Sequence, residues 1–414
     1  MREIAPDVYE IAQKHGKHLV FHVGTHSFWW VDDLENEINL LFQSIEEYKR
    51  NNKGNLELDL NRDPKNISTF GKLTLISANS CNLACRYCYA DEGGYSFAPK
   101  VMDPHTAINI VGKIITTFGE IPWIQFFGGE PLLGYTTIKA VVETFKDIDY
   151  TINTNGVLIN DRISEFLKKN MKEIYISLDG PKEINDVNRV FKNGRGSFIY
   201  VEKGLKKLQS APGDAKIIAE ATYTREHLRT GISMVEIYEY LTEELGFDDA
   251  YITWAMYPPE RAFTGKEWEF IINQYVELIK YTMSRNSKAL LSSEVTGILY
   301  PIKKIYPCTA GLSTITVMPT GDVYPCYLLI EQKFWMGNVL SNQFPGPEFF
   351  KVRNLIETLT NKIKHPKCGS CILKYACVDC IGKRLHQMGD VYLVNPRECQ
   401  LKREMFTTIA KEVL

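Results

Sequence analysis

Short apolar runs alternate with helical stretches through the central part of the chain. Each run has the length and the β-branched or aromatic content of a buried strand. One intervening helix is marked by Asp103 and Pro104 at its start and Gly119 at its end. Such alternation predicts βα units and a parallel sheet, which collects ligands at the carboxyl ends of its strands. The pattern from residue 72 to 256 therefore predicts an α/β partial barrel with six strands: KLTLIS, WIQFFG, YTINTN, IYISLD, IIAEATY and AYITWAM.

The two flanking regions have different patterns. Residues 18–23 and 27–32 are β-rich and are separated by a Gly-containing turn, so they predict a hairpin. Apolar residues at helical spacing from Leu34 to Tyr48 predict an amphipathic helix after it, and a polar linker should follow. After the barrel, three further helices are expected at residues 264–290, at 349–362 and from 399 to the end.

Composition and charge exclude several function classes. The chain has 414 residues, of which 44% are hydrophobic, so it can bury a large core. Its formal net charge of −2 gives no basic field for gathering nucleic acid. The chain contains neither a signal peptide nor an apolar run long enough to span a membrane. We therefore expect a cytoplasmic protein with no nucleic-acid or membrane partner.

The ten cysteines fall into two groups, which is typical of metal sites rather than of disulfides in a reducing compartment. Cys81, Cys85 and Cys88 have C-x3-C-x2-C spacing directly after the first strand, and the next cysteine is Cys308. A structural zinc needs four protein ligands. A [4Fe-4S] cluster has four irons, so three thiolates would leave one iron open to a small molecule.

The segment CNLACRYC, at this position after KLTLIS, resembles the signature loop of the radical SAM enzymes. The resemblance implies a partial (β/α)6 barrel and a [4Fe-4S] cluster held by Cys81, Cys85 and Cys88. The amino and carboxylate groups of S-adenosyl-L-methionine would bind the fourth iron. One electron from the reduced cluster would then break the sulfur-carbon bond and give a 5'-deoxyadenosyl radical. That radical would abstract hydrogen from the substrate.

Segments at later strand ends resemble further motifs of this family. FFGGEP corresponds to the GGE motif, in which the glycines allow close backbone approach and the glutamate accepts from the methionine ammonium. NTNG and SLDGP correspond to contacts with ribose and carboxylate. Taken alone, each feature is also typical of a turn or of core packing. The resemblance implies cofactor contacts at Tyr87 (near adenine), Gly128, Gly129, Glu130, Asn155, Ser177, Asp179 and Arg189.

The second cysteine group is similar to the SPASM extension of peptide-modifying radical SAM enzymes. By themselves, its paired C-x2-C spacings would favour zinc. The resemblance implies two auxiliary [4Fe-4S] clusters, although the x2 gap between Cys377 and Cys380 departs from the usual x3. No cysteine near Cys308 supplies a fourth proximal ligand, so a substrate thiolate, a carboxylate or water could complete that cluster. The implied ligands are Cys308, Cys326 and Cys380 for the proximal cluster, and Cys368, Cys371, Cys377 and Cys399 for the distal one.

The predicted hairpin and helix at the N-terminus resemble the RiPP recognition element, which binds a leader peptide as an added strand. A plain cap on the barrel is the alternative interpretation. Three domains are therefore predicted: a leader-binding module at residues 1–65, the radical SAM barrel at 66–290, and the SPASM domain at 291–414.

Together these resemblances imply a maturase that forms thioether cross-links in a ribosomally synthesised precursor peptide. Its cofactors would be three [4Fe-4S] clusters and S-adenosyl-L-methionine. Its partners would be a cysteine-containing peptide with a leader and an electron donor such as flavodoxin or ferredoxin. The alternatives are a sulfatase-type maturase that makes formylglycine, an enzyme that forms carbon-carbon links, and a non-catalytic zinc or iron-sulfur scaffold. The sequence identifies neither the peptide nor a general base.

Overall fold

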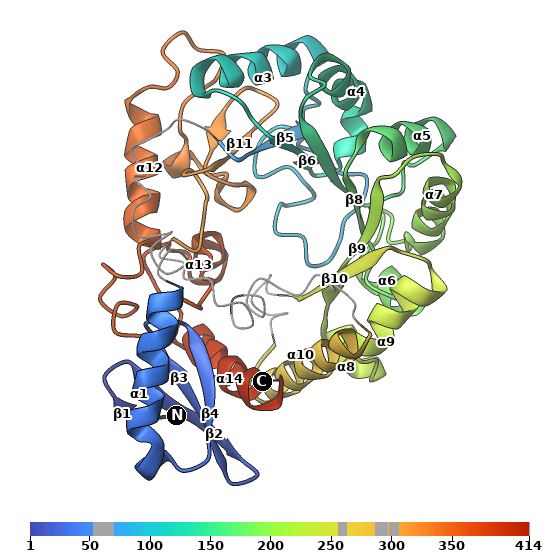
Figure 1. The fold of residues 1–414 in the computed structure, drawn as a ribbon. Coiled ribbons are helices and arrows are strands. Elements are labelled where there is room, and N and C mark those ends of the chain that lie inside the picture. Colours follow the sequence, from blue (N-terminus) through green and yellow to red (C-terminus); the bar gives the residue numbers. More distant parts are fainter. Residues whose placement is uncertain (53–69, 256–262, 286–296, 298–305, 414) are drawn as a thin grey trace.

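The largest element of the molecule is a curved sheet with helices on its outer side (Figure 1). The structure is a computed structural model that describes residues 1–52, 70–255, 263–285, 297 and 306–413. The strand order is β10-β9-β8-β7-β6-β5-β11-β12, and all neighbours from β10 to β11 are parallel. The expected α/β partial barrel is confirmed.

The six apolar runs form six consecutive strands of this sheet. Apolar side chains on one face pack against the helices, and alternate residues point into the barrel. The sequence did not indicate the two further strands that extend the sheet from the cysteine-rich region, because they have only four and two residues. The strands are β5 (Lys72–Ala78), β6 (Trp123–Gly128), β7 (Asp149–Thr154), β8 (Glu173–Ser177), β9 (Lys216–Tyr223), β10 (Asp249–Trp254), β11 (Thr314–Val317) and β12 (Val323–Tyr324).

The connecting helices cover the outer face of the barrel. In α3, the Asp103 side chain accepts from the backbone N–H of Thr106, and Gly119 ends the helix, both as predicted. The helix expected at 264–290 is α10, with the later residues of that range outside the described part. The helices are α3 (Pro104–Phe118), α4 (Tyr135–Thr144), α5 (Asp161–Asn170), α6 (Lys182–Asn188), α7 (Phe198–Ser210), α8 (Arg225–Thr230), α9 (Met234–Glu239) and α10 (Lys266–Ser284), with a 3-10 turn η1 (Pro131–Gly134) and a π turn η2 (Tyr240–Glu244).

The N-terminal region is a four-stranded antiparallel sheet followed by one long helix. The predicted hairpin and helix are present as β3, β4 and α1, whereas β1 and β2 were not predicted, because charged and polar residues interrupt their apolar pattern. Most of the predicted linker lies outside the described residues. The elements are β1 (Arg2–Ala5), β2 (Val8–Lys14), β3 (Lys17–His22), β4 (Ser27–Val31) and α1 (Leu34–Asn51).

This small sheet is packed between α1 and the C-terminal helix α14 (Pro396–Val413). Val20 on one face joins the cluster formed with α1. On the other face, the ring of Phe21 lies 4.9 Å from that of Phe406 in α14. Figure 1 shows the blue N-terminal sheet beside the red C-terminal helix. Among the described residues, the N-terminal module therefore docks on the C-terminal helix of the cysteine-rich region.

The C-terminal region packs across the open side of the barrel (Figure 1). Its helices are α12 (Pro347–Thr360), α13 (Ile381–Met388) and α14, with 3-10 turns η4 (Tyr327–Leu329) and η5 (Gln332–Phe334). Both predicted domain boundaries, at 65/66 and 290/291, fall outside the described residues and remain predictions. None of the described helices combines the length and apolar character needed to cross a membrane.

Candidate active site

The loop that carries Cys81, Cys85 and Cys88 leaves the carboxyl end of β5 and is tied to a second segment of the barrel. The backbone N–H of Ala84 donates to the carbonyl of Val190 over 2.7 Å, and that of Arg86 donates to Asn188 over 2.9 Å. All three cysteines are free thiols and line one large cavity. The loop conformation is therefore set by contacts with the segment after α6 as well as by its own sequence.

The two glycines of FFGGEP lie directly against the backbone of this loop. A Cβ on Gly129 would lie 2.3 Å from the carbonyl oxygen of Ser80, and one on Gly128 would lie 2.2 Å from that of Ala78. Both residues also line the cavity. The sequence predicted a close backbone approach at these two glycines. In the structure, the backbone that approaches them is that of the cysteine loop and the residue at its start, and a larger side chain at either glycine would clash with it.

Glu130 is fully buried between β6 and β7 and is not among the residues that line the cavity. Its carboxylate accepts from Thr154 Oγ1 (2.7 Å) and from the backbone N–H groups of Asn155 (2.8 Å) and Leu132 (2.9 Å). Burial raises the pKa of Glu130, and these hydrogen bonds oppose the rise. The carboxylate joins two strand ends in this structure, and its contact with the methionine ammonium remains a prediction.

Asn155 connects the end of β7 to the cysteine loop. Its Nδ2 donates to Asn82 Oδ1 over 2.7 Å and lies 3.7 Å from Cys81 Sγ. Asn155 and Ser177 both line the cavity. The structure thus brings these two predicted residues to the same space as the three thiols, while their ligand contacts remain predictions.

Tyr87, Asp179 and Arg189 form one buried network. The Tyr87 hydroxyl donates to the Asp179 carboxylate over 2.7 Å, and Arg189 Nη1 donates to the Tyr87 oxygen over 2.6 Å. Burial raises the pKa of Asp179, although the nearby Arg189 charge favours its ionised form. Tyr87 and Arg189 line the cavity, whereas Asp179 lies behind them and accepts a backbone hydrogen bond from Thr222. The direct contact predicted for Asp179 remains untested, and here Asp179 positions the other two side chains.

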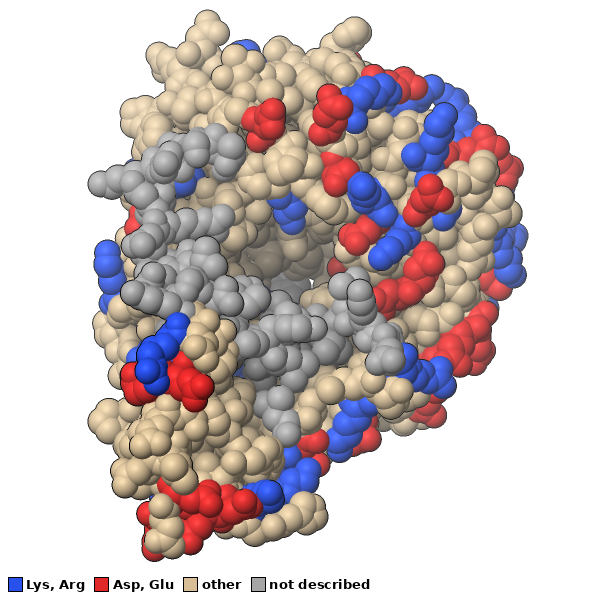
Figure 2. Space-filling view, in the orientation of Figure 1, with Lys and Arg blue, Asp and Glu red and all other residues tan. Residues whose placement is uncertain are grey.

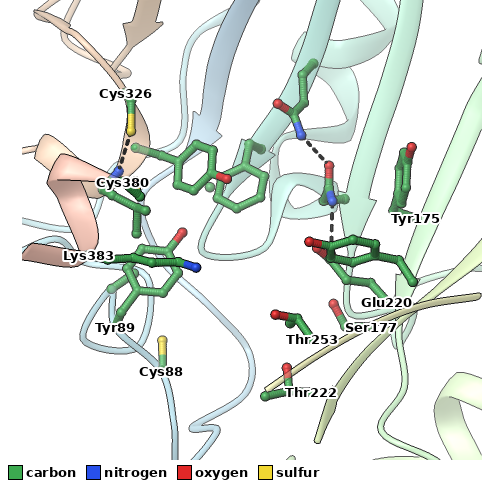
Figure 3. A pocket seen from close by; sticks show the side chains of 18 of the residues that line it. Cys88, Tyr89, Tyr175, Ser177, Glu220, Thr222, Thr253, Cys326, Cys380 and Lys383 are labelled. Carbon is green, nitrogen blue, oxygen red and sulfur yellow. Dashed lines mark hydrogen bonds between the residues drawn. The ribbon is translucent and has the colours of Figure 1, made fainter. Parts of the chain in front are cut away.

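The second cysteine group divides into two sets in space. Cys308, Cys326 and Cys380 line the same cavity as the first three cysteines. Cys326 follows β12, and its sulfur accepts from the backbone N–H of Leu328 over 3.2 Å (Figure 3). Cys380 is the N-cap residue of α13. The remaining cysteines are not among the residues that line the cavity: Cys368, Cys371, Cys377 and Cys399.

Burial raises the pKa of thiols in both cavity-lining sets, which favours their protonated form in the metal-free protein. It raises the pKa of Cys81 to about 12, with a further contribution from Glu130. It also raises the pKa of Cys308 to about 12, with Cys380 adding to the effect. Thiolates are the ligands of iron-sulfur clusters, so cluster binding would offset this cost by supplying positive iron. Within the described part of the chain, no group of three His, Cys, Asp or Glu could hold a single metal ion.

The cavity has a volume of about 1120 Å³ and opens near the centre of the face shown in Figure 2, where acidic and basic side chains are mixed. Aromatic rings line it between the two cysteine sets. The Tyr327 ring stacks on Phe127 with centroids 4.5 Å apart and lies 6.2 Å from Tyr89, which follows Cys88 in the chain. The three rings form an apolar wall between the two cysteine sets, and Figure 3 labels Tyr89 beside Cys88.

Sequence reasoning missed a row of polar side chains inside the barrel. Lys72 Nζ donates to Gln125 (3.1 Å), Gln125 Nε2 donates to Asn153 (2.6 Å), and Asn153 Nδ2 donates to Glu220 (3.0 Å). These residues occupy inward positions on β5, β6, β7 and β9. Their signal in the sequence was a polar residue at alternate positions within otherwise apolar strands.

Comparison with known proteins identifies two domains. A family model for the radical SAM superfamily matches residues 75–219. A model for an iron-sulfur cluster-binding domain, SPASM, matches residues 308–372. The first match includes the first cysteine triad and the strand-end motifs, and the second includes Cys308, Cys326, Cys368 and Cys371.

Curated relatives match over different lengths. The chain is 40% identical over 144 residues to the uncharacterized protein MJ0907 of Methanocaldococcus jannaschii, which is 33% of this chain and 48% of that protein. It is 35% identical over 156 residues to the radical SAM cyclopropyl synthase TigE of Paramaledivibacter caminithermalis, which is 33% and 32% of the two chains. These two matches thus span less than half of each relative. The mycofactocin maturase MftC of Mycobacterium ulcerans is 26% identical, over 70% of this chain and 77% of that protein.

Two solved structures share the fold. The enzyme anSMEcpe with bound AdoMet (S-adenosylmethionine) has a TM-score of 0.65 at 20% identity, covering 82% of this chain and 96% of that one. Streptococcus suis SuiB bound to the precursor peptide SuiA has a TM-score of 0.57 at 15% identity, covering 97% and 100%. The cysteine loop at the first strand end and the two matching domains place this chain in the radical SAM superfamily of enzymes, with a C-terminal SPASM domain.

Proposed function

We propose that this protein is a peptide maturase that installs a thioether link between a cysteine sulfur and a carbon of a ribosomally synthesised precursor peptide. The observation that carries the proposal is the single cavity lined by both Cys81, Cys85, Cys88 and Cys308, Cys326, Cys380. A peptide in that cavity could present a C–H group to the first set and a thiol to the second. The relatives MftC and TigE and the peptide-bound SuiB structure support a peptide-modifying role.

The residues at the first site suit an iron-sulfur cluster with S-adenosyl-L-methionine. When bound, these groups supply a 5'-deoxyadenosyl radical that takes a hydrogen atom from the substrate. Tyr87 and Arg189, held by Asp179, would position the nucleoside, and Asn155 and Ser177 face the same space. The apolar wall of Phe127, Tyr89 and Tyr327 limits access of water to a radical formed there.

A substrate thiol is a suitable fourth ligand at the second site, because Asp379, an acidic side chain near Cys308 and Cys380, is already engaged. Asp379, next to Cys380, forms a buried ion pair with Arg384. Arg384 itself is 2% exposed and also donates to the Val391 carbonyl over 3.1 Å. Rotating Asp379 toward the cysteines would leave the guanidinium charge buried without its partner, which is costly. We therefore propose that the peptide thiolate completes the proximal cluster.

The direct test is anaerobic incubation of the reconstituted protein, a reductant and S-adenosyl-L-methionine with the cysteine-containing precursor peptide. A thioether removes two hydrogen atoms per link and leaves no thiol for alkylation, both visible by mass spectrometry.

A second experiment tests the thiolate ligand. In the Cys81/Cys85/Cys88 triple-Ala variant, adding this peptide should perturb the spectrum of the proximal cluster. A peptide with that cysteine changed to serine should not, because its alcohol stays protonated. An unchanged spectrum in a sample shown to bind the cysteine peptide would contradict the thioether proposal.

A second candidate is the oxidation of cysteine to formylglycine. Cysteine-type anaerobic sulfatase-maturating enzyme of Clostridium perfringens is 23% identical over 71% of this chain and 84% of that protein, and anSMEcpe shares the fold. A formylglycine product carries an aldehyde that reacts with hydrazides, whereas a thioether does not. The same incubation therefore distinguishes the two products. The SPASM match gives no support to the zinc scaffold.

We further propose that the N-terminal sheet binds the leader of the peptide at strand β4. Among the described residues, β4 pairs with β3 alone, so its other edge can accept an added strand. Trp30 on this strand is 37% exposed. Trp30→Ala should raise the dissociation constant for the full precursor about tenfold or more, since a buried aromatic anchor often contributes over ~1.4 kcal/mol.

Ile199→Ala is the matched control for the leader site, because Ile199 is 39% exposed on α7 of the barrel. It should leave the dissociation constant unchanged. Equal affinity of the Trp30→Ala variant and of the wild-type protein for the full precursor would make the N-terminal sheet a structural cap on α14. Electron supply from flavodoxin or ferredoxin is also proposed, and reduction of the reconstituted clusters by either protein would test it.

A further inference from the structure

Peptide oxidation at this site needs a proton acceptor. In the proposed reaction, a hydrogen atom leaves the peptide C–H to form 5'-deoxyadenosine, the cysteine thiol loses its proton as its sulfur binds at the second cysteine set, and the carbon-sulfur bond then forms while one electron passes to an oxidised iron-sulfur cluster of the SPASM region. One proton then remains. The same balance holds for formylglycine and for a carbon-carbon link. The inference below rests on the proposed function only in this general form.

Glu220 lies inside the barrel at the level of the proposed cofactor site. On β9 it is paired with Ser177 of β8 and with Tyr251 of β10, and its side chain lines the cavity (Figure 3). Oε2 accepts from Asn153 Nδ2 over 3.0 Å. Glu130, by comparison, accepts three hydrogen bonds with its carboxylate and is not among the residues that line the cavity.

The row of polar side chains inside the barrel determines which atom donates in the hydrogen bond between Asn153 and Glu220. Lys72 donates to the Gln125 oxygen, so the Gln125 amide nitrogen must donate to Asn153 Oδ1. The Asn153 nitrogen is then directed at Glu220. In the part of the chain that the structure describes, no hydrogen bond to Oε1 of Glu220 is found. Because the Glu220 side chain lines the cavity, this oxygen can accept a proton from a bound molecule.

Among the described residues, no Lys, Arg or His forms a salt bridge with Glu220. Burial raises its pKa, the Asn153 hydrogen bond and Arg189 oppose the rise, and Asp179 adds to it. Arg189 and Asp179 are already bridged by Tyr87. The other titratable groups around this carboxyl are the hydroxyls of Tyr175, Tyr251 and Tyr327.

We propose that Glu220 is the general base that accepts the proton released from the peptide in this oxidation. The proposal depends on position as well as chemistry. Asn153 orients the carboxylate, and the Glu220 side chain lines the cavity. Glu220 is also the direct partner of Ser177 on the neighbouring strand. A base held near the site of hydrogen abstraction can act without letting bulk water reach the radical.

The test is Glu220→Gln, which keeps the shape and removes the base. With precursor peptide, this variant should still form 5'-deoxyadenosine, while the yield of modified peptide should fall about a hundredfold. Glu173→Gln is the matched control, because Glu173 also lines the cavity, on β8, and accepts from the Tyr175 hydroxyl over 2.8 Å. It should retain modification at close to the wild-type yield.

The pH profile separates a base from a structural residue. The rate of peptide modification by the wild-type protein should rise as pH increases through the pKa of Glu220. This rising part of the pH profile should be absent in Glu220→Gln. Asn153→Leu removes the donor that stabilises the carboxylate, so it should move the rising part of the pH profile to higher pH. This variant provides a second test if Glu220→Gln does not fold. Infrared difference spectra of the cluster-free protein should show a carboxyl titration that disappears in Glu220→Gln and persists in Glu173→Gln.

Three results would overturn the inference. Loss of S-adenosyl-L-methionine binding or cleavage in Glu220→Gln would make Glu220 part of the cofactor site. Unchanged modification would show that another group takes the proton. An unchanged pH profile in both Glu220 and Asn153 variants would have the same meaning. If the wild-type protein itself causes no loss of hydrogen from any peptide, the proposed function fails, and that result is distinct from all three.

Discussion

The two cysteine sets that line the cavity are built in opposite ways. The first comes from eight consecutive residues in a loop at the end of β5, seated on Gly128 and Gly129. The second comes from three positions that lie 18 and 54 residues apart, since 326 − 308 = 18 and 380 − 326 = 54. It is brought together by β12 and the start of α13. The first set depends on local sequence and the second on tertiary packing.

This difference predicts different sensitivities. The first loop has its own backbone hydrogen bonds to the barrel, so a change there should affect chemistry more than folding. The second set depends on buried contacts such as the Asp379–Arg384 pair. A change there should affect folding, cluster content and product together.

The largest effect is expected from the Cys81/Cys85/Cys88 triple-Ala change. It should abolish 5'-deoxyadenosine formation, because no open iron remains to bind S-adenosyl-L-methionine. If the protein holds three [4Fe-4S] clusters, the change should also remove about four of about twelve irons. Iron and sulfide analysis, with chromatography of the nucleoside, measures both. Cleavage that persists under dithionite would exclude this assignment.

Cys326→Ala should separate initiation from bond formation. Cleavage of S-adenosyl-L-methionine should continue, while modified peptide falls at least about tenfold, equivalent to about 1.4 kcal/mol of lost transition-state stabilisation. The ratio of modified peptide to 5'-deoxyadenosine is the measurement. If that ratio equals the wild-type value, the proximal cysteines have no part in bond formation.

Arg384→Met tests whether the second set depends on buried packing. The change leaves Asp379 buried without its partner, which should lower the free energy of unfolding by about 3–5 kcal/mol. Lys206→Ala breaks an exposed pair with Glu202 on α7 and should cost less than about 0.5 kcal/mol. Urea titration compares them, and equal midpoints would contradict the proposed dependence.

The smallest effect concerns the support beneath the first site. His227 is fully buried, and its Nε2 donates to the Asp179 carbonyl over 2.7 Å. Burial lowers its pKa below the ordinary value of 6.5. Because the unfolded chain then binds more protons, stability should fall as pH drops below 6.5, by up to about 1.4 kcal/mol per pH unit. His227→Asn should show a shallower pH dependence of unfolding, and an identical slope would rule out this contribution.

The sequence predicted the barrel well, because each strand is a short apolar run between helix signals. It did not indicate β11 and β12, since strands of four and two residues carry too little pattern. The N-terminal hairpin and helix were predicted, but their docking on α14 through Phe21 and Phe406 was not. Contacts between segments nearly 400 residues apart leave no periodic signal in either segment.

By itself, the sequence determined the radical SAM and SPASM domains and the cysteines that mark them, because ligand spacing in a loop is a local property. Tertiary structure alone decided that Cys81 and Cys326 share one cavity, that Asp179 acts behind Tyr87 and Arg189, and that Glu220 faces the cavity. The physical reason is that burial, hydrogen-bond partners and charge surroundings depend on which strands lie side by side. Those neighbours are fixed only when the strands have assembled into the curved sheet around the site.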